Sequence, residues 1–231
     1  IGLSDFQSLI EEDYYYVDKS LLIKELIDSG SLVTILPRPR RFGKTLNLNM
    51  LKCFFEIKGP GADNLFKHLA IWEEGEEYRE RYGKNPVIYL TFKDVKFSDW
   101  SRCYEKIKLD ITELYDDHRH LLDSSHLTDE DKKGYKEILT ETAPNMRWNN
   151  SLRTLSRLLW KHYNKKVVIL IDEYDIPIQQ GYLHQFYPRV VEFIKTFLSG
   201  ALKDNPYLEF SVLTGILRVS KESIFSDLNN P

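Results

Sequence analysis

Gly43, Lys44 and Thr45 stand together in the sequence, where a phosphate-binding loop would carry them. The apolar run of residues 32–36 comes shortly before them, and a helical pattern follows. A strand, a turn with Gly-Lys-Thr and a helix are the usual arrangement for holding the phosphates of ATP or GTP. We expect the backbone N–H groups from Phe42 onward to face the phosphates. Lys44 would reach the outer phosphates, and the Thr45 hydroxyl would bind Mg²⁺.

The loop departs from the full phosphate-binding pattern at its start. Arg38 occupies the position where that pattern has its first glycine, and a proline flanks it on each side. Pro39 has no N–H, so it cannot donate a hydrogen bond to a phosphate. The alternative is that Gly-Lys-Thr begins an ordinary surface helix by chance, since short motifs recur by accident. On the first interpretation, the nucleotide contacts come from Arg40, Arg41, Phe42, Gly43, Lys44, Thr45 and Leu46.

A second motif places acidic side chains at the end of a buried strand. The aliphatic residues 167–171 lead directly into Asp172 and Glu173. Such a run is typical of a parallel strand covered on both faces, and its end opens into the crevice where α/β sheets bind ligands. Asp172 would hold Mg²⁺ beside Thr45, and Glu173 would deprotonate the water that attacks the γ-phosphate. A solvated acidic turn is the alternative, but the two motifs together favour nucleotide binding.

Two further candidates lie near the end of the sequence. Thr214 closes the strand pattern of residues 207–214 and would emerge near the γ-phosphate, although a Thr-Gly turn is an equally common reason for this pair. Arg218 is the best candidate for neutralising the charge that builds up during phosphoryl transfer. Arg40 and Arg41 compete for that role, and ordinary solvated surface charge is the alternative for both.

The composition argues against several other classes of protein. The net charge is −3 over 231 residues, so no basic field points to nucleic acid. No apolar run reaches membrane-spanning length and no secretory signal opens the sequence, so we expect a cytoplasmic location. Cys53 and Cys103 lack metal or redox spacing and are expected as buried thiols. His118, His120 and His126 lack a regular ligand spacing, so no metal site is predicted there.

The rest of the sequence alternates strand and helix patterns. This alternation predicts an α/β fold with a parallel, doubly wound sheet, which is the architecture of a P-loop NTPase. The excess helix at about 97–150 is expected to form an inserted helical lobe within one domain spanning 1–231. Strands are expected at 32–36, 86–92, 167–171 and 207–214, and helices at 18–29, 46 to about 59, 100–120, 129–139, 150–163 and 188–202.

These motifs resemble the AAA-ATPase-like family of bacteria and archaea, in which Arg38 at the first-glycine position is ordinary. The resemblance implies a P-loop ATP-binding domain and often a further C-terminal domain similar to restriction-type nucleases, which we expect beyond residue 231. It also implies that Tyr16 and its neighbours as far as Lys19 lie near the adenine, although an aromatic core position is equally consistent with these tyrosines. The stretches that carry the resemblance are Tyr16–Ser20, Pro37–Thr45, Ile171–Asp175, Leu213–Gly215 and Lys221–Asn230.

The function expected from these residues is Mg²⁺-dependent binding and hydrolysis of ATP, coupled to a conformational switch. An attached domain would link that switch to nucleic acid. The sequence leaves open whether the chain forms a homo-oligomer. One alternative is a nucleotide-binding sensor or scaffold with little turnover, which the proline-stiffened loop favours slightly. A small-molecule kinase is another, but Glu173 argues against it because kinases exclude water rather than activate it.

Overall fold

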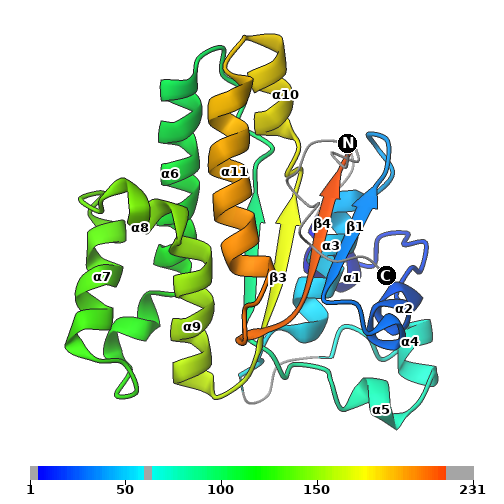
Figure 1. Cartoon of the computed structure of the whole chain (residues 1–231). Helices are drawn as coiled ribbons and strands as arrows, with labels where there is room; N and C mark the ends of the chain where they lie inside the picture. The colour runs from blue at the N-terminus through cyan, green and yellow to red at the C-terminus, as the bar shows by residue number, and fades with distance from the viewer. Residues whose placement is uncertain (1–4, 60–63, 217–231) are drawn as a thin grey trace.

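The computed structural model describes residues 5–59 and 64–216. At its centre lies a sheet of four parallel strands, whose order across the sheet is β1-β4-β3-β2 (Figure 1). The strands are β1 (Val33–Pro37), β2 (Val87–Thr91), β3 (Val167–Asp172) and β4 (Leu208–Gly215). The strand that is last in sequence, β4, thus lies between β1, which leads into the phosphate loop, and β3, which carries the acids. The α/β fold and the parallel sheet predicted from the sequence are confirmed, and the strand order is that of a P-loop core.

Helices cover both faces of this sheet (Figure 1). The first face carries α1 (Phe6–Glu11), α2 (Leu21–Ser29), α3 (Lys44–Phe55), α4 (Ala70–Glu73) and α5 (Glu76–Arg79). The second face carries α6 (Trp100–Asp117), the 3₁₀ helix η1 (Arg119–Asp123), α7 (Asp129–Leu139), α8 (Asn145–Asn149), α9 (Ser151–Tyr163), α10 (Ile176–Leu183) and α11 (Tyr187–Leu202).

Strand β3 shows how one sequence pattern produces two cores. All six of its residues are buried. Val167, Ile169 and Ile171 belong to the hydrophobic cluster on the α9 and α11 side, whereas Val168 and Leu170 belong to the cluster on the α3 side. Successive strand side chains point to opposite faces, so a strand with helices on both sides needs an unbroken apolar run.

The pairing register brings the polar strand ends to one edge of the sheet. Leu213 of β4 pairs with Ile171 of β3, and Leu36 of β1 pairs with Thr214. Because the strands are parallel, the residues that follow these pairs emerge together. Thr214 therefore lies between the end of β1 and Asp172.

Residues 100–149 fold as α6, η1, α7 and α8, and their apolar side chains share one cluster with the sheet face beneath them. Helix α10 begins immediately after the acidic turn and was not predicted, because Pro177 and Gly181 interrupt its periodicity. In the described part of the chain, every helix falls short of the length and apolar character that a membrane crossing requires.

Candidate functional site

The loop between β1 and α3 turns through two residues with left-handed backbone angles. Arg41 has φ 68° and Gly43 has φ 72°. Glycine adopts this conformation without strain, whereas arginine does so at a cost. Backbone N–H groups around such residues form a concave nest that binds anions. Helix α3 begins at Lys44, so the N–H groups of its first turn and the positive end of its dipole add to the attraction for anions.

The Lys44 side chain folds back over this loop. Its Nζ donates to the backbone carbonyl oxygens of Arg38 at 3.0 Å and Pro39 at 3.1 Å. The side chain is buried, with 8% of its surface exposed. An ammonium group has three donors, so the two carbonyls leave one for a ligand. The lysine therefore places a positive charge inside the loop and holds the loop closed around it.

Asp172 joins the phosphate loop to the last strand. The Thr45 hydroxyl donates to Asp172 Oδ2 at 2.7 Å, and the Thr214 hydroxyl donates to Asp172 Oδ1. Asp172 is fully buried and Thr214 is nearly so. Each carboxylate oxygen thus has a hydroxyl partner, and three residues far apart in sequence form one polar cluster. In this structure the Thr214 hydroxyl is a hydrogen-bond donor to the Asp172 carboxylate.

The same oxygen atoms fit a magnesium ion. Mg²⁺ prefers oxygen ligands and is usually held by one or two carboxylates, together with waters and substrate phosphates. Thr45 and Asp172 supply a hydroxyl and a carboxylate in contact with each other, beside the phosphate loop. Across residues 5–59 and 64–216 no group of three or more His, Cys, Asp or Glu side chains could hold a metal alone. The donor set therefore suits an ion whose coordination is completed by phosphate and water.

Glu173 follows Asp172 in an unusual backbone conformation, with φ 52°. Burial raises the pKa of its carboxyl group above the usual 4.5, and the negative charge of Asp172 raises it further. Lys96 and Lys44 act in the opposite direction. Within the described ranges the Glu173 carboxylate accepts no hydrogen bond. A half-buried carboxylate without a partner and with a raised pKa is suited to accept a proton from water.

A cavity of about 350 Å³ opens beside the phosphate loop, between α2, β1 and α3. It contains three cationic side chains, Lys19, Arg38 and Lys44, and one acidic side chain, Glu25. The excess of positive charge suits a polyphosphate ligand. The remaining wall is mainly apolar and is formed by Leu21, Leu22, Leu36, Phe42, Leu48 and Leu51, with Asn47 and Thr214 as polar members.

Some predicted site residues lie outside this cavity. Arg40 and Arg41 are exposed and form no ion pair within the described residues. Leu46 packs against the hydrophobic cluster on the α3 side of the sheet. The Tyr16 hydroxyl donates to the sulfur of Met50 at 3.2 Å, and its ring makes an edge contact with Phe6, so this tyrosine occupies an aromatic core position. The predicted Arg218 lies outside the described residues.

Sequence patterns gave no site role to Asn47 or Asp175, and Lys19 entered only through the family resemblance, yet the structure brings all three to the site. The Nζ of Lys19 lies 3.8 Å from the position of a Cβ atom at Gly43, next to the phosphate loop. Asn47 lines the cavity one turn after Gly43. Asp175 is completely buried behind the acidic turn. For Asp175 the signal was a third acid, two residues beyond Glu173, in a segment that the structure buries.

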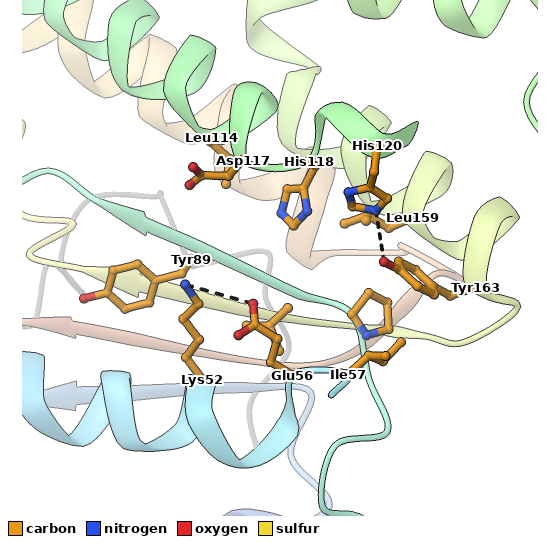
Figure 2. A pocket seen from close by; sticks show the side chains of 12 residues that line it. Lys52, Glu56, Ile57, Tyr89, Leu114, Asp117, His118, His120, Leu159 and Tyr163 are labelled. Atoms are coloured by element: carbon orange, nitrogen blue, oxygen red, sulfur yellow. Dashed lines mark hydrogen bonds and ion pairs between the residues drawn. The ribbon is translucent and has the colours of Figure 1, made fainter. Parts of the chain in front are cut away.

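A second cavity, of about 390 Å³, lies at the other end of α3 (Figure 2). Figure 2 shows Lys52 of α3 and Glu56, the residue that follows this helix, on one side and His118, His120 and Tyr163 on the other. The Tyr163 hydroxyl and His120 Nε2 are hydrogen bonded at 2.9 Å. The phosphate loop contributes no residue to its lining, so this cavity is separate from the candidate nucleotide site.

His118 in this second cavity makes the fold sensitive to acid. Burial and, to a smaller extent, the nearby charges of His120 and Lys52 lower its pKa from 6.5 to about 4. In the unfolded chain His118 is therefore protonated as the pH falls through about 6.5, whereas in the folded chain it is protonated only near pH 4. The contribution of neutral His118 to the free energy of unfolding is fully present above pH 6.5 and decreases as the pH falls from 6.5 to 4; the loss is ~2 kcal/mol at pH 5.

We expect His118→Phe to remove this loss of stability, measured by urea unfolding at pH 7.5 and pH 5. Exposed His68→Phe is the control and should retain the loss.

Comparison with known proteins finds a matching family. The model of a family described as "Predicted AAA-ATPase" matches residues 1–225. An uncharacterised protein from the vnfD 5′ region of Azotobacter chroococcum mcd 1 is 28% identical over 232 residues, covering 100% of this chain. The chain spans 39% of the length of that relative. No solved structure matches significantly.

Proposed function

The chain belongs to the predicted AAA-ATPase family, and we propose that it binds ATP together with Mg²⁺ and hydrolyses it to ADP and phosphate. The observation that carries this proposal is the 2.7 Å hydrogen bond between Thr45 and Asp172. These residues are 127 positions apart, and each was identified from its own motif. Their contact brings the helix that begins at the phosphate loop to the acidic strand.

In this proposal the loop binds the phosphates and Lys44 neutralises their charge. The backbone N–H groups at Arg41–Thr45 surround the phosphate oxygens, as anion-binding nests do. The Lys44 ammonium, held by two carbonyls, donates its remaining N–H to the outer phosphates. Lys19 adds positive charge at the rim. Because much of the catalysis of phosphoryl transfer comes from positioning and charge stabilisation, these groups make up most of the site.

Thr45 and Asp172 are the residues that would hold Mg²⁺. When bound, the ion would neutralise the negative charge that develops on the phosphate oxygens. The Thr214 hydroxyl fixes the orientation of the Asp172 carboxylate through its hydrogen bond to Oδ1.

Glu173 acts as the general base. Its carboxylate accepts a proton from water as the water oxygen attacks the γ-phosphate, and ADP leaves. The bond to the water oxygen forms while the bond between the γ-phosphorus and the bridging oxygen breaks. The raised pKa of Glu173 improves its strength as a base, and it remains ionised above that pKa.

The leucine-lined part of the cavity between α2 and α3 is the proposed position of the base and ribose, whereas its cationic side chains serve the phosphates. Its apolar leucine wall suits a flat ring, and Phe42, with 59% of its surface exposed, is able to pack against one. Asn47 and Glu25 provide polar groups for the edge of the ring. Tyr16 supports the wall from behind through its contact with Met50 of α3.

The proposal is tested by phosphate release from ATP and by calorimetric binding, each with and without Mg²⁺. We expect release that requires Mg²⁺. Thr45→Val keeps the shape of the side chain and removes the hydroxyl, so turnover should fall at least about tenfold and more Mg²⁺ should be needed. Thr196→Val is the matched control, because that exposed hydroxyl donates to the Glu192 carbonyl of its own helix.

Binding without measurable phosphate release would instead indicate a nucleotide sensor or scaffold. Equal phosphate release with and without Mg²⁺ would contradict the roles given to Thr45 and Asp172. We further propose that hydrolysis drives a conformational switch that acts on an attached nucleic-acid-processing domain or on further copies of the chain. The chain spans only part of its relative, which leaves room for such a domain in the whole protein.

A further inference from the structure

Asp175 has a buried carboxylate that no role described above uses. It stands at the N-cap of α10, a position where the aspartate side chain usually accepts a hydrogen bond from a backbone N–H of the first helical turn. Its side chain makes no such bond. Instead, Oδ2 accepts from the backbone N–H of Ile216 at 2.9 Å and from the Gln179 side chain at 2.7 Å. The carboxylate thus gives up a helix cap worth about 1 kcal/mol and instead binds the residue that follows β4.

The chain segment that Asp175 holds connects two parts of the site, the phosphate loop and the acidic turn. The Gly215 carbonyl accepts from Arg38 N–H in the phosphate loop at 3.0 Å. The Thr214 carbonyl accepts from Tyr174 N–H in the acidic turn, at 3.1 Å. The end of β4 is therefore bonded to the loop on one side and to the acidic turn on the other (Figure 1).

Gly215 keeps space for this arrangement. A Cβ atom at this position would lie 2.7 Å from Asp175 Oδ1, 2.9 Å from Asp175 Cγ and 3.1 Å from the Tyr174 ring. The closest of these distances is one that folded proteins essentially never show for a Cβ atom. Any side chain at position 215 would push the carboxylate away from Ile216.

The bonds of Asp175 bear directly on the groups proposed for hydrolysis. Glu173 has φ 52°, and a residue in that region costs about 1–3 kcal/mol and persists only where its surroundings hold it. Asp175 lies two residues further along the same turn. Through Ile216 N–H it fixes the strand end that bears Thr214, whose hydroxyl orients Asp172.

We propose that Asp175 is a positioning residue for ATP hydrolysis, which sets Glu173 and Thr214 relative to Asp172. The inference rests on the proposed function and adds a residue that touches neither the phosphates nor the ion. Its signature is a loss of kcat without a loss of ATP binding, because Lys44 and the loop N–H groups keep their places.

The experiment compares steady-state ATP hydrolysis by the parental chain, Asp175→Asn and Gly215→Ala. Asparagine keeps the size of the side chain and removes the charge that strengthens its hydrogen bonds. We expect kcat to fall about 10- to 100-fold in both variants, with KM for ATP within about threefold of the parental value. Asp5→Asn is the matched control, because that N-cap carboxylate accepts from Ser8 N–H of its own helix at 2.6 Å. It should leave kcat unchanged, because asparagine also caps the helix and Asp5 lies outside the site.

The outcomes separate the two proposals. If the parental chain hydrolyses ATP and Asp175→Asn has the same kcat, the positioning role is overturned and the proposed function stands. A parallel loss of kcat, ATP binding and thermal stability in both variants shows a merely structural residue and also overturns it. If Asp175→Asn fails to fold, the kcat and KM of Gly215→Ala decide between these outcomes, since that variant retains the carboxylate and only displaces it. A parental chain that releases no phosphate overturns the proposed function itself.

Discussion

Glu173→Gln is expected to reduce ATP hydrolysis by about 10²- to 10⁴-fold while leaving ATP binding intact. Glutamine has the same shape as glutamate but cannot accept a proton from the attacking water. The phosphate loop, Lys44 and the Thr45–Asp172 pair are unchanged by this substitution. Single-turnover phosphate release and calorimetric binding of ATP, measured on the same sample, check the result.

The pH dependence of turnover gives a second reading of the same residue. The parental rate should fall as the pH drops through the pKa of Glu173, because the protonated carboxyl group is no base. Burial places this acid limb above pH 4.5, the usual pKa of glutamate. The limb should be absent from the residual activity of Glu173→Gln. Exposed Glu192→Gln is the control, and parental turnover in Glu173→Gln would rule out the general-base role.

Lys44→Met is expected to weaken ATP binding at least about 100-fold, equal to ~2.7 kcal/mol. The lysine supplies charge-assisted hydrogen bonds to the phosphates, each worth about 1.5–3 kcal/mol. Methionine has a similar length, so the buried site stays filled. In the parental chain, ATP at 100 times its Kd should raise Tm by about 5–10 °C. The variant should show no such rise.

Lys52→Met on the same helix separates the charge of Lys44 from a general effect of removing a lysine. Lys52 lies two turns further along α3, 4.0 Å from Glu56, at the other cavity. Its loss should leave the ATP-induced rise in Tm unchanged. The Tm of Lys44→Met without nucleotide should stay within a few degrees of the parental value. An undiminished ATP-induced rise in Lys44→Met would refute the phosphate-binding role.

The structure also explains how the phosphate loop works without its first glycine. The left-handed backbone angles fall at Arg41 and Gly43, later in the loop. Arg38 N–H donates to the Gly215 carbonyl at 3.0 Å, which continues the pairing of β1 with β4 by one residue. A residue that extends a strand needs no positive φ, so arginine is tolerated at this position.

The sequence alone determined the local chemistry of this protein. Gly43, Lys44 and Thr45 before a helical pattern predicted the phosphate loop, and the aliphatic run before Asp172 predicted a strand buried on both faces. These are properties of neighbouring residues: a turn, a helix start and a two-residue periodicity are all written within about ten positions. The parallel α/β fold followed from the order of such segments.

Only the tertiary structure decided which of these segments meet. The insertion of β4 between β1 and β3 places Thr214 against Asp172, and it gives Asp175 a strand end to hold. The same packing turns Tyr16 into the core and forms the cavity from α2 and α3. Strand order and register depend on how complete faces of the sheet and helices are buried against each other. A local sequence pattern does not specify the distant segment with which it pairs.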